Sequence, residues 1–98
     1  MNGIKKIPVN CPACSSKLDV AKLSCASCGT SVEGSFSLPI LAQLPNEDID
    51  FLLEFIKTSG SLKEMAKFTG HSYPKVRNTL DDIIKRLTVI EKSYYKED

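Results

Sequence analysis

The sequence lacks several features that would place it in other classes of protein. It has no tryptophan and one histidine among 98 residues, which leaves little for a complex active site. No apolar run approaches the roughly 18 residues of a membrane-spanning helix, and the start of the chain lacks the apolar core of a signal peptide. Lys and Arg number 13 and Asp and Glu number 12, so neither sign of charge dominates. We therefore expect a soluble cytoplasmic protein.

Cysteine is also scarce, but the four cysteine residues lie in two pairs along the sequence. They form two C-x-x-C motifs that are separated by ten residues. Two thiolates in one tight turn can bind one ion, and two such turns complete a tetrahedron around zinc. The predicted ligands of a single structural Zn²⁺ are Cys11, Cys14, Cys25 and Cys28.

Other uses of these cysteines are less well supported. Cytosolic cysteines stay reduced, which favours metal over disulfides. A redox role is disfavoured because neither pair precedes a helical pattern of the thioredoxin kind. Four thiolates leave no open position for water or substrate, which disfavours catalytic zinc. Iron in place of zinc, and cysteines without metal, remain open alternatives.

The residues around the cysteines predict short β-strands. Residues 17–23 can form a small hairpin between the two pairs, and the alternation of Val32, Phe36 and Leu38 predicts one further strand. Gly29 allows the backbone conformation that turns N–H groups toward sulfur. A segment of this size buries too little surface to fold without a metal. We therefore predict a four-cysteine zinc ribbon.

Composition changes near residues 34–45, where glycine, serine and two Leu-Pro pairs interrupt any long helix. The predicted domains are residues 1–37, the zinc ribbon, and residues 38–98, a helical domain. The predicted fold class is therefore α+β, a small zinc ribbon of short β-strands followed by an all-α helix-turn-helix domain.

The helical domain should begin with an amphipathic helix that ends at Thr58-Ser59-Gly60. Asn46 is a candidate N-cap, and acidic residues follow it in the first turn. Apolar residues spaced at i, i+3, i+4 and i+7 predict the buried face of this helix. They are Ile49, Leu52, Leu53 and Ile56. Phe51 and Phe55 widen this stripe, so we expect the helix to be buried on more than one side.

Two further helices form the pattern of a helix-turn-helix. Ser61 with Glu64 predicts the capped start of a short helix, and Gly70 its end. Ser72 should cap a third helix that runs to about residue 92, with Pro74 in its first turn. A short helix, a turn with glycine and a second helix are typical of this motif. A helical bundle that does not bind DNA is the alternative.

The pattern resembles the helix-turn-helix of sigma-factor region four and related response regulators. The matching segments are Leu44-Pro45, residues 61–70 and residues 76–80. With C-P-x-C and C-x-x-C-G ahead of it, the chain also resembles a family of small uncharacterised prokaryotic proteins that join a zinc ribbon to such a motif. The resemblance implies this fold and binding to nucleic acid.

Basic residues are concentrated in this motif. Residues 61–80 contain four basic side chains and one acidic one. The second helix of such a motif enters the major groove by its N-terminal turns, where Arg pairs with guanine and Asn with adenine. Basic residues on the first helix suit phosphates. The predicted DNA contacts are Lys63, Lys67, Ser72, Tyr73, Lys75, Arg77 and Asn78.

The most consistent function is a DNA-binding transcriptional regulator that is not an enzyme. The alternative is a protein-interaction adaptor that contacts the transcription machinery without sequence-specific DNA binding. A single small module buries little surface on DNA, so we also expect a homodimer through the C-terminal helix. Its seam would be Ile83, Leu87, Ile90 and Tyr94. The first three of these also belong to the predicted inner stripe of this helix, with Val76, Leu80 and Ile84.

Overall fold

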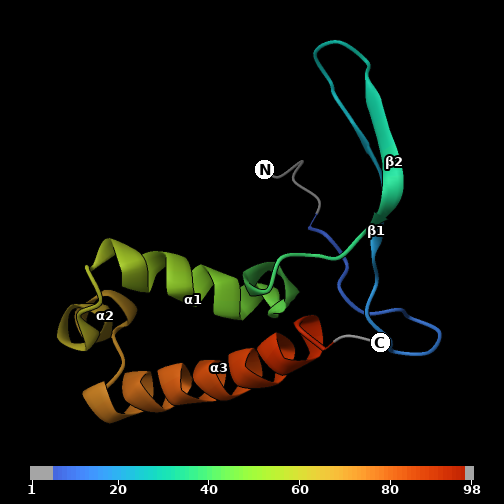
Figure 1. Ribbon diagram of the computed structural model, residues 1–98. Coiled ribbons are helices and arrows are strands. Elements are labelled where there is room, and N and C mark those ends of the chain that lie inside the picture. Colours follow the sequence, from blue (N-terminus) through green and yellow to red (C-terminus); the bar gives the residue numbers. More distant parts are fainter. Residues whose placement is uncertain (1–5, 97–98) are drawn as a thin grey trace. The chain divides into compact units, whose positions relative to one another are not determined.

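The computed structural model describes residues 6–96 and divides into two compact units, Met1–Pro39 and Ile40–Asp98. The predicted boundary lies two residues before this division. The elements in chain order are β1 (Val20–Ser24), β2 (Ser31–Phe36), the 3-10 helix η1 (Leu41–Gln43), α1 (Asn46–Lys57), α2 (Leu62–Thr69) and α3 (Tyr73–Tyr94) (Figure 1). The predicted α+β class, with strands before helices, is confirmed. None of the described helices is long and apolar enough to cross a membrane.

The first unit contains one antiparallel hairpin, in which β1 pairs with β2. Lys22 lies opposite Glu33, and an irregularity in register separates Val20 from Lys22. The prediction of a hairpin within residues 17–23 was wrong, because this segment supplies only one strand and the loop before it. The second cysteine pair itself reverses the chain between β1 and β2, so no separate hairpin is needed.

This hairpin has no buried side chain. Every residue of β2 is exposed, and in β1 only Val20 is partly shielded. Leu23 and Val32 pair across the strands, yet they remain 56% and 50% exposed. Backbone pairing without a covered apolar face is marginal in water. The hairpin therefore has no hydrophobic core to stabilise it.

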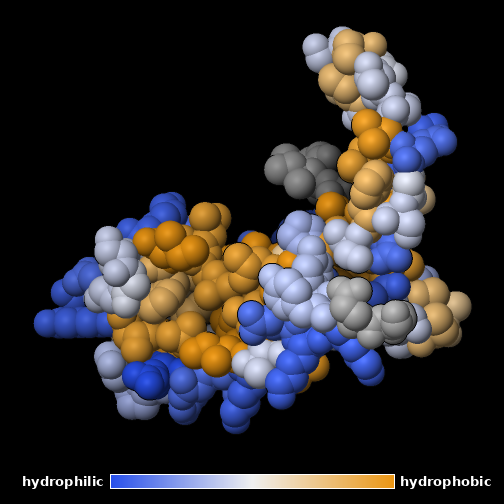
Figure 2. All heavy atoms as spheres, viewed as in Figure 1, coloured by the Kyte–Doolittle hydropathy of each residue, from blue (hydrophilic) through white to orange (hydrophobic). Residues whose placement is uncertain are grey.

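The second unit has a true core. Leu44 and Ile83 are fully buried, and Ile90 is 8% exposed in the same cluster. Apolar residues of the helical unit gather between α1 and α3, while hydrophilic residues line the outer edge of α3 (Figure 2). The partly buried residues that pack against this cluster are Ile40, Ile49, Phe51, Leu52 and Leu87.

The buried face of α1 is rotated from the predicted one. Leu53 and Ile56 are 56% and 68% exposed, so two of the four predicted core positions were wrong. The side chains turned inward share the spacing i, i+3, i+4 and i+7 but start one residue earlier. They are Asp48, Phe51, Leu52 and Phe55. Ile49 also packs against the core, and the partial burial of Phe51 and Phe55 agrees with the predicted widening of the stripe. Asn46 is also not the N-cap; Pro45 holds that position without a side-chain hydrogen bond.

An ion pair explains why an acidic residue occupies this face. The Arg86 guanidinium on α3 donates from Nε to Asp48 Oδ2 at 2.6 Å and from a terminal nitrogen to Oδ1 at 2.9 Å. Asp48 is 4% exposed, and a buried carboxylate needs such partners. The hydrogen bond with Asp48 raises the pKa of Arg86. The pair therefore fixes how α1 packs against α3.

The structure also corrects the predicted dimer seam. Ile83 and Ile90 lie in the core of a single chain, at 0% and 8% exposure, so they cannot face a partner. The periodicity that suggested a seam arises from packing within the unit, against α1 and the residues that flank η1, Ile40 and Leu44.

Candidate metal centre and nucleic-acid interface

The first cysteine turn is closed by backbone hydrogen bonds. Cys11 N–H donates to Ser16 O at 2.7 Å, and Ser15 N–H donates to Cys11 O at 2.8 Å. The Ala13 N–H also points at Cys11 Sγ, at 3.3 Å. An isolated bridge between Asn10 and Lys17 joins the two ends of the turn. This arrangement presents backbone N–H groups to sulfur, as a thiolate ligand requires.

The second cysteine turn repeats this geometry. Cys25 N–H donates to Thr30 O at 2.7 Å, and Gly29 N–H donates to Cys25 O at 2.8 Å. Gly29 has φ +79°, as predicted for the turn, and Ser15 holds the same place in the first turn with φ +66°. Left-handed backbone suits glycine and strains other residues. The two turns therefore share one conformation, but only the second has the residue that adopts it without strain.

One thiol in each turn is activated by a neighbouring hydroxyl. A hydrogen bond from the Ser16 side chain lowers the pKa of Cys14. The Thr30 hydroxyl lies 3.0 Å from Cys28 Sγ and lowers the pKa of that thiol. A lowered pKa favours the thiolate, which is the form that binds metal. Each C-x-x-C pair is therefore chemically suited to be half of a four-thiolate site.

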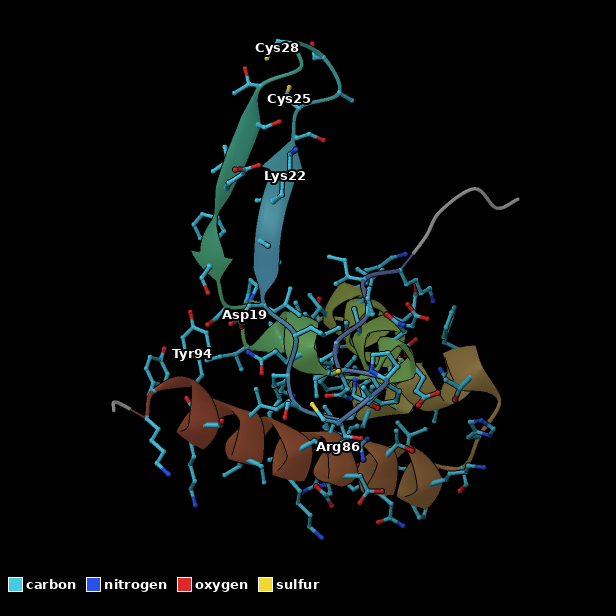
Figure 3. All side chains as sticks on the ribbon, turned by 90° about the vertical axis from the view of Figure 1, so that its right-hand side faces the viewer. Asp19, Lys22, Cys25, Cys28, Arg86 and Tyr94 are labelled. Carbon is cyan, nitrogen blue, oxygen red and sulfur yellow. The ribbon has the colours of Figure 1, made fainter. Side chains whose placement is uncertain are left out.

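The structure does not bring the two halves together. Cys25 and Cys28 stand at the far tip of the hairpin (Figure 3), whereas the first turn lies beyond its opposite end (Figure 1). Among the described residues, no group of three or more metal-ligating side chains is close enough to hold an ion. All four thiols are free. The donor set fits zinc, and binding by all four requires the two turns to approach each other.

The predicted helix-turn-helix is present in α2, the turn and α3. Ser61 accepts from Glu64 N–H at 3.1 Å and Ser72 from Lys75 N–H at 3.3 Å, so both predicted caps are confirmed. Gly70 ends α2 with φ +76°. Met65 on α2 and Val76 on α3 are each 1% exposed, and they anchor the two helices of the motif.

The seven predicted DNA-contact residues are all exposed. They are Lys63, Lys67, Ser72, Tyr73, Lys75, Arg77 and Asn78. The side chains of Tyr73, Lys75, Arg77 and Asn78 come from the first two turns of α3, next to the turn that joins it to α2. Because Val76 points into the core, these neighbours are directed to solvent.

Sequence reasoning missed the acidic partners of this surface. Lys67 Nζ lies 3.5 Å from a Glu64 oxygen, and Arg77 Nε lies 3.5 Å from Asp81 Oδ1. Each acid is one helical turn from its base, a spacing that the sequence shows. Asp81 was overlooked because it lies just beyond the basic segment that we counted.

Comparison with protein families covers most of the chain. Residues 11–42 match a family model described as the DUF2089 zinc ribbon, and residues 44–90 match one described as a domain of unknown function (DUF2089) with a helix-turn-helix. The chain belongs to the DUF2089 family. Searches among curated proteins and among solved structures returned no match.

The two DUF2089 segments coincide with the features described above. The zinc-ribbon segment includes all four cysteines and the β1–β2 hairpin. The helix-turn-helix segment runs from Leu44 of the core to Ile90 and so includes every predicted DNA contact. The predicted resemblance to a family of zinc-ribbon and helix-turn-helix proteins is confirmed. The likeness to sigma-factor region four is not shown by these comparisons.

Proposed function

We propose that this chain is a transcriptional regulator that binds duplex DNA through α2 and α3. The observation that carries the proposal is the face at the start of α3, where Tyr73, Lys75, Arg77 and Asn78 are exposed together while Val76 anchors the helix. A helix supported in this way can enter a major groove with its first turns at the base edges. A helix-turn-helix joined to a zinc ribbon is consistent with a nucleic-acid-binding regulator.

We assign distinct roles within this face. Arg77 and Asn78 would contact base edges, since their donors and acceptors match guanine and adenine. The lysines would contact phosphates, which hold the protein on DNA of any sequence. Ser72 and Tyr73, at the N-terminus of α3, would meet the backbone beside the groove.

We also propose that the ribbon binds one structural Zn²⁺ through Cys11, Cys14, Cys25 and Cys28. When bound, the ion would cross-link the two cysteine turns. Support comes from the matching turns, the activated Cys14 and Cys28 thiols, and the absence of any buried side chain in the described hairpin. Four thiolates leave no open position on the metal, so we propose no catalytic role. Zinc binding by four thiolates requires reduced cysteines, a condition that the cytoplasm provides.

Binding to a random pool of DNA duplexes tests the proposal. Arg77→Ala should weaken binding to the selected sequence by roughly 1–3 kcal/mol and relax base preference. Lys67→Ala should weaken binding to all duplexes and lower the slope of log affinity against log salt by about 0.9. Lys92→Ala is the control, because Lys92 lies roughly 28 Å along α3 from Tyr73.

The opposite outcomes are equally clear. No binding to any duplex at low salt would overturn the proposal and favour the adaptor role. If the Lys67 and Lys92 substitutions changed DNA affinity equally, α2 would not be part of the DNA interface.

A further inference from the structure

The two arginines of α3 are held by carboxylates in different ways. Arg86 donates both Nε and a terminal nitrogen to Asp48, so one complete edge of its guanidinium is occupied within the fold. Arg77 Nε lies 3.5 Å from Asp81 Oδ1, which is a longer contact than either bond of Arg86. The terminal nitrogens of Arg77 can offer a pair of parallel N–H donors at the tip of its guanidinium.

The contact between Arg77 and Asp81 is poorly suited to stabilising the protein. Both side chains are about half exposed, at 56% and 47%, and exposed ion pairs of this kind contribute little to folding. The carboxylate is also a liability beside DNA, since it repels phosphates. A role in orienting Arg77 accounts for an acid at this position better than a role in stability does.

We propose that Asp81 is a positioning residue for base recognition by Arg77. The inference rests on the proposed DNA-binding function. Asp81 follows Arg77 by one helical turn, and its carboxylate holds the Nε side of the guanidinium against α3. In the proposed complex, the tip of the guanidinium would then face the groove. A guanine presents two acceptors, O6 and N7, that match two donors at the tip of an arginine. The substrate class is therefore duplex DNA with a guanine opposite Arg77.

Fixing the guanidinium has a defined physical benefit. A free arginine side chain has many rotamers, and ordering it on binding costs free energy. A guanidinium already held by Asp81 loses less freedom when it meets the base. The carboxylate also neutralises the arginine when no guanine is present, so Arg77 gains less from a nearby phosphate on the wrong sequence. Both effects increase discrimination between sequences more than they increase affinity.

The test compares discrimination in matched variants of the full chain loaded with zinc. The duplex is the sequence selected from a random pool by the wild-type protein, and its variants change the one base pair whose preference Arg77→Ala abolishes. We define the ratio as the affinity for the selected duplex divided by the affinity for the altered duplex. Asp81→Asn should reduce this ratio about threefold or more, within the range that one bidentate contact provides. Asp81→Glu, which keeps the carboxylate, should retain most of the ratio.

A matched control separates positioning from simple charge. Asp82→Asn removes the same charge from the next residue, which is not paired with Arg77. Each substitution removes one repulsive charge, so both should raise affinity for the altered duplex by a similar factor. Asp82→Asn should raise affinity for the selected duplex equally, whereas Asp81→Asn should not, so only Asp81→Asn should lower the ratio. In Arg77→Ala, adding Asp81→Asn should cause no further loss of discrimination.

The outcomes distinguish this inference from the proposed function. Sequence-selective binding with an unchanged ratio in Asp81→Asn would overturn the role of Asp81 alone. A loss of ratio in Asp82→Asn equal to that in Asp81→Asn would do the same, because it would show a general charge effect. Failure of the wild-type chain to bind any duplex would overturn the proposed function and this inference together.

Discussion

The two units of this chain are stabilised by different means. The helical unit buries Leu44, Met65, Val76 and Ile83 almost completely, whereas the β1–β2 hairpin buries none of its side chains. The helical unit also contains a buried carboxylate that is satisfied by Arg86. One unit therefore has a core that can hold it folded, whereas the hairpin of the other has none, and this difference is the reason for proposing that a metal stabilises it.

Loss of one cysteine should have the largest effect, and only on the ribbon. Cys25→Ser removes one ligand of four, so metal content should fall from about one zinc per chain to nearly none. Metal analysis of the purified protein measures this. Thermal unfolding of the helices, followed by circular dichroism, should not change. A Cys25→Ser protein that kept both its zinc and a protected hairpin would contradict the metal site.

Loss of a core side chain should instead destabilise the helical unit and leave the ribbon unchanged. Leu44→Ala should destabilise the helical unit by about 2–5 kcal/mol, since Leu44 is 0% exposed and its removal leaves a cavity. Ile56→Ala is the matched control, because Ile56 is 68% exposed, and its effect should be within about 0.5 kcal/mol. Denaturant unfolding gives both values. The zinc content of Leu44→Ala should equal that of the wild type; loss of zinc would mean that the units depend on each other.

The smallest expected effect distinguishes the two cysteine turns. Gly29→Ala should weaken zinc binding by about 1 kcal/mol, or about fivefold, because the turn requires a positive φ that alanine adopts only with strain. An added Cβ would meet no other atom, so backbone strain is the only expected cost. Ser15→Gly should strengthen binding by a similar factor. Competition with a chelator measures both affinities. Ser15→Ala, which keeps a Cβ, should have no such benefit; an equal gain from Ser15→Ala would show that the serine hydroxyl matters and the backbone does not.

Local chemistry made the helix-turn-helix predictable from sequence. The caps at Ser61 and Ser72 and the left-handed Gly70 depend only on neighbouring residues. The cysteine pairs were equally clear, because metal-ligand spacing is a local property. The choice of face on α1 was not local. Asp48 was predicted only as one of the acidic residues in the first turn of α1, whereas its contact with Arg86, 38 residues later in the chain, accounts for its burial.

The same limit applies to the sheet and to the third helix. The strand pattern within residues 17–23 was visible, but its partner lay beyond the second cysteine pair rather than within the same segment. In α3, Ile83 and Ile90 have the spacing of a dimer seam and equally of a core stripe. Hydrophobic periodicity shows that a face is buried but does not show what covers it.

The proposal that only the ribbon depends on metal can be tested by hydrogen exchange. Amide protection in the full chain is compared with zinc bound and after a chelator has removed it. Amides of β1 and β2 should lose their protection when zinc is removed, while those of α1 and α3 should keep theirs, and added zinc should restore the hairpin. Loss of protection in the helices together with the hairpin would contradict it, because both units would then share one source of stability. An equally protected hairpin without zinc would also contradict it.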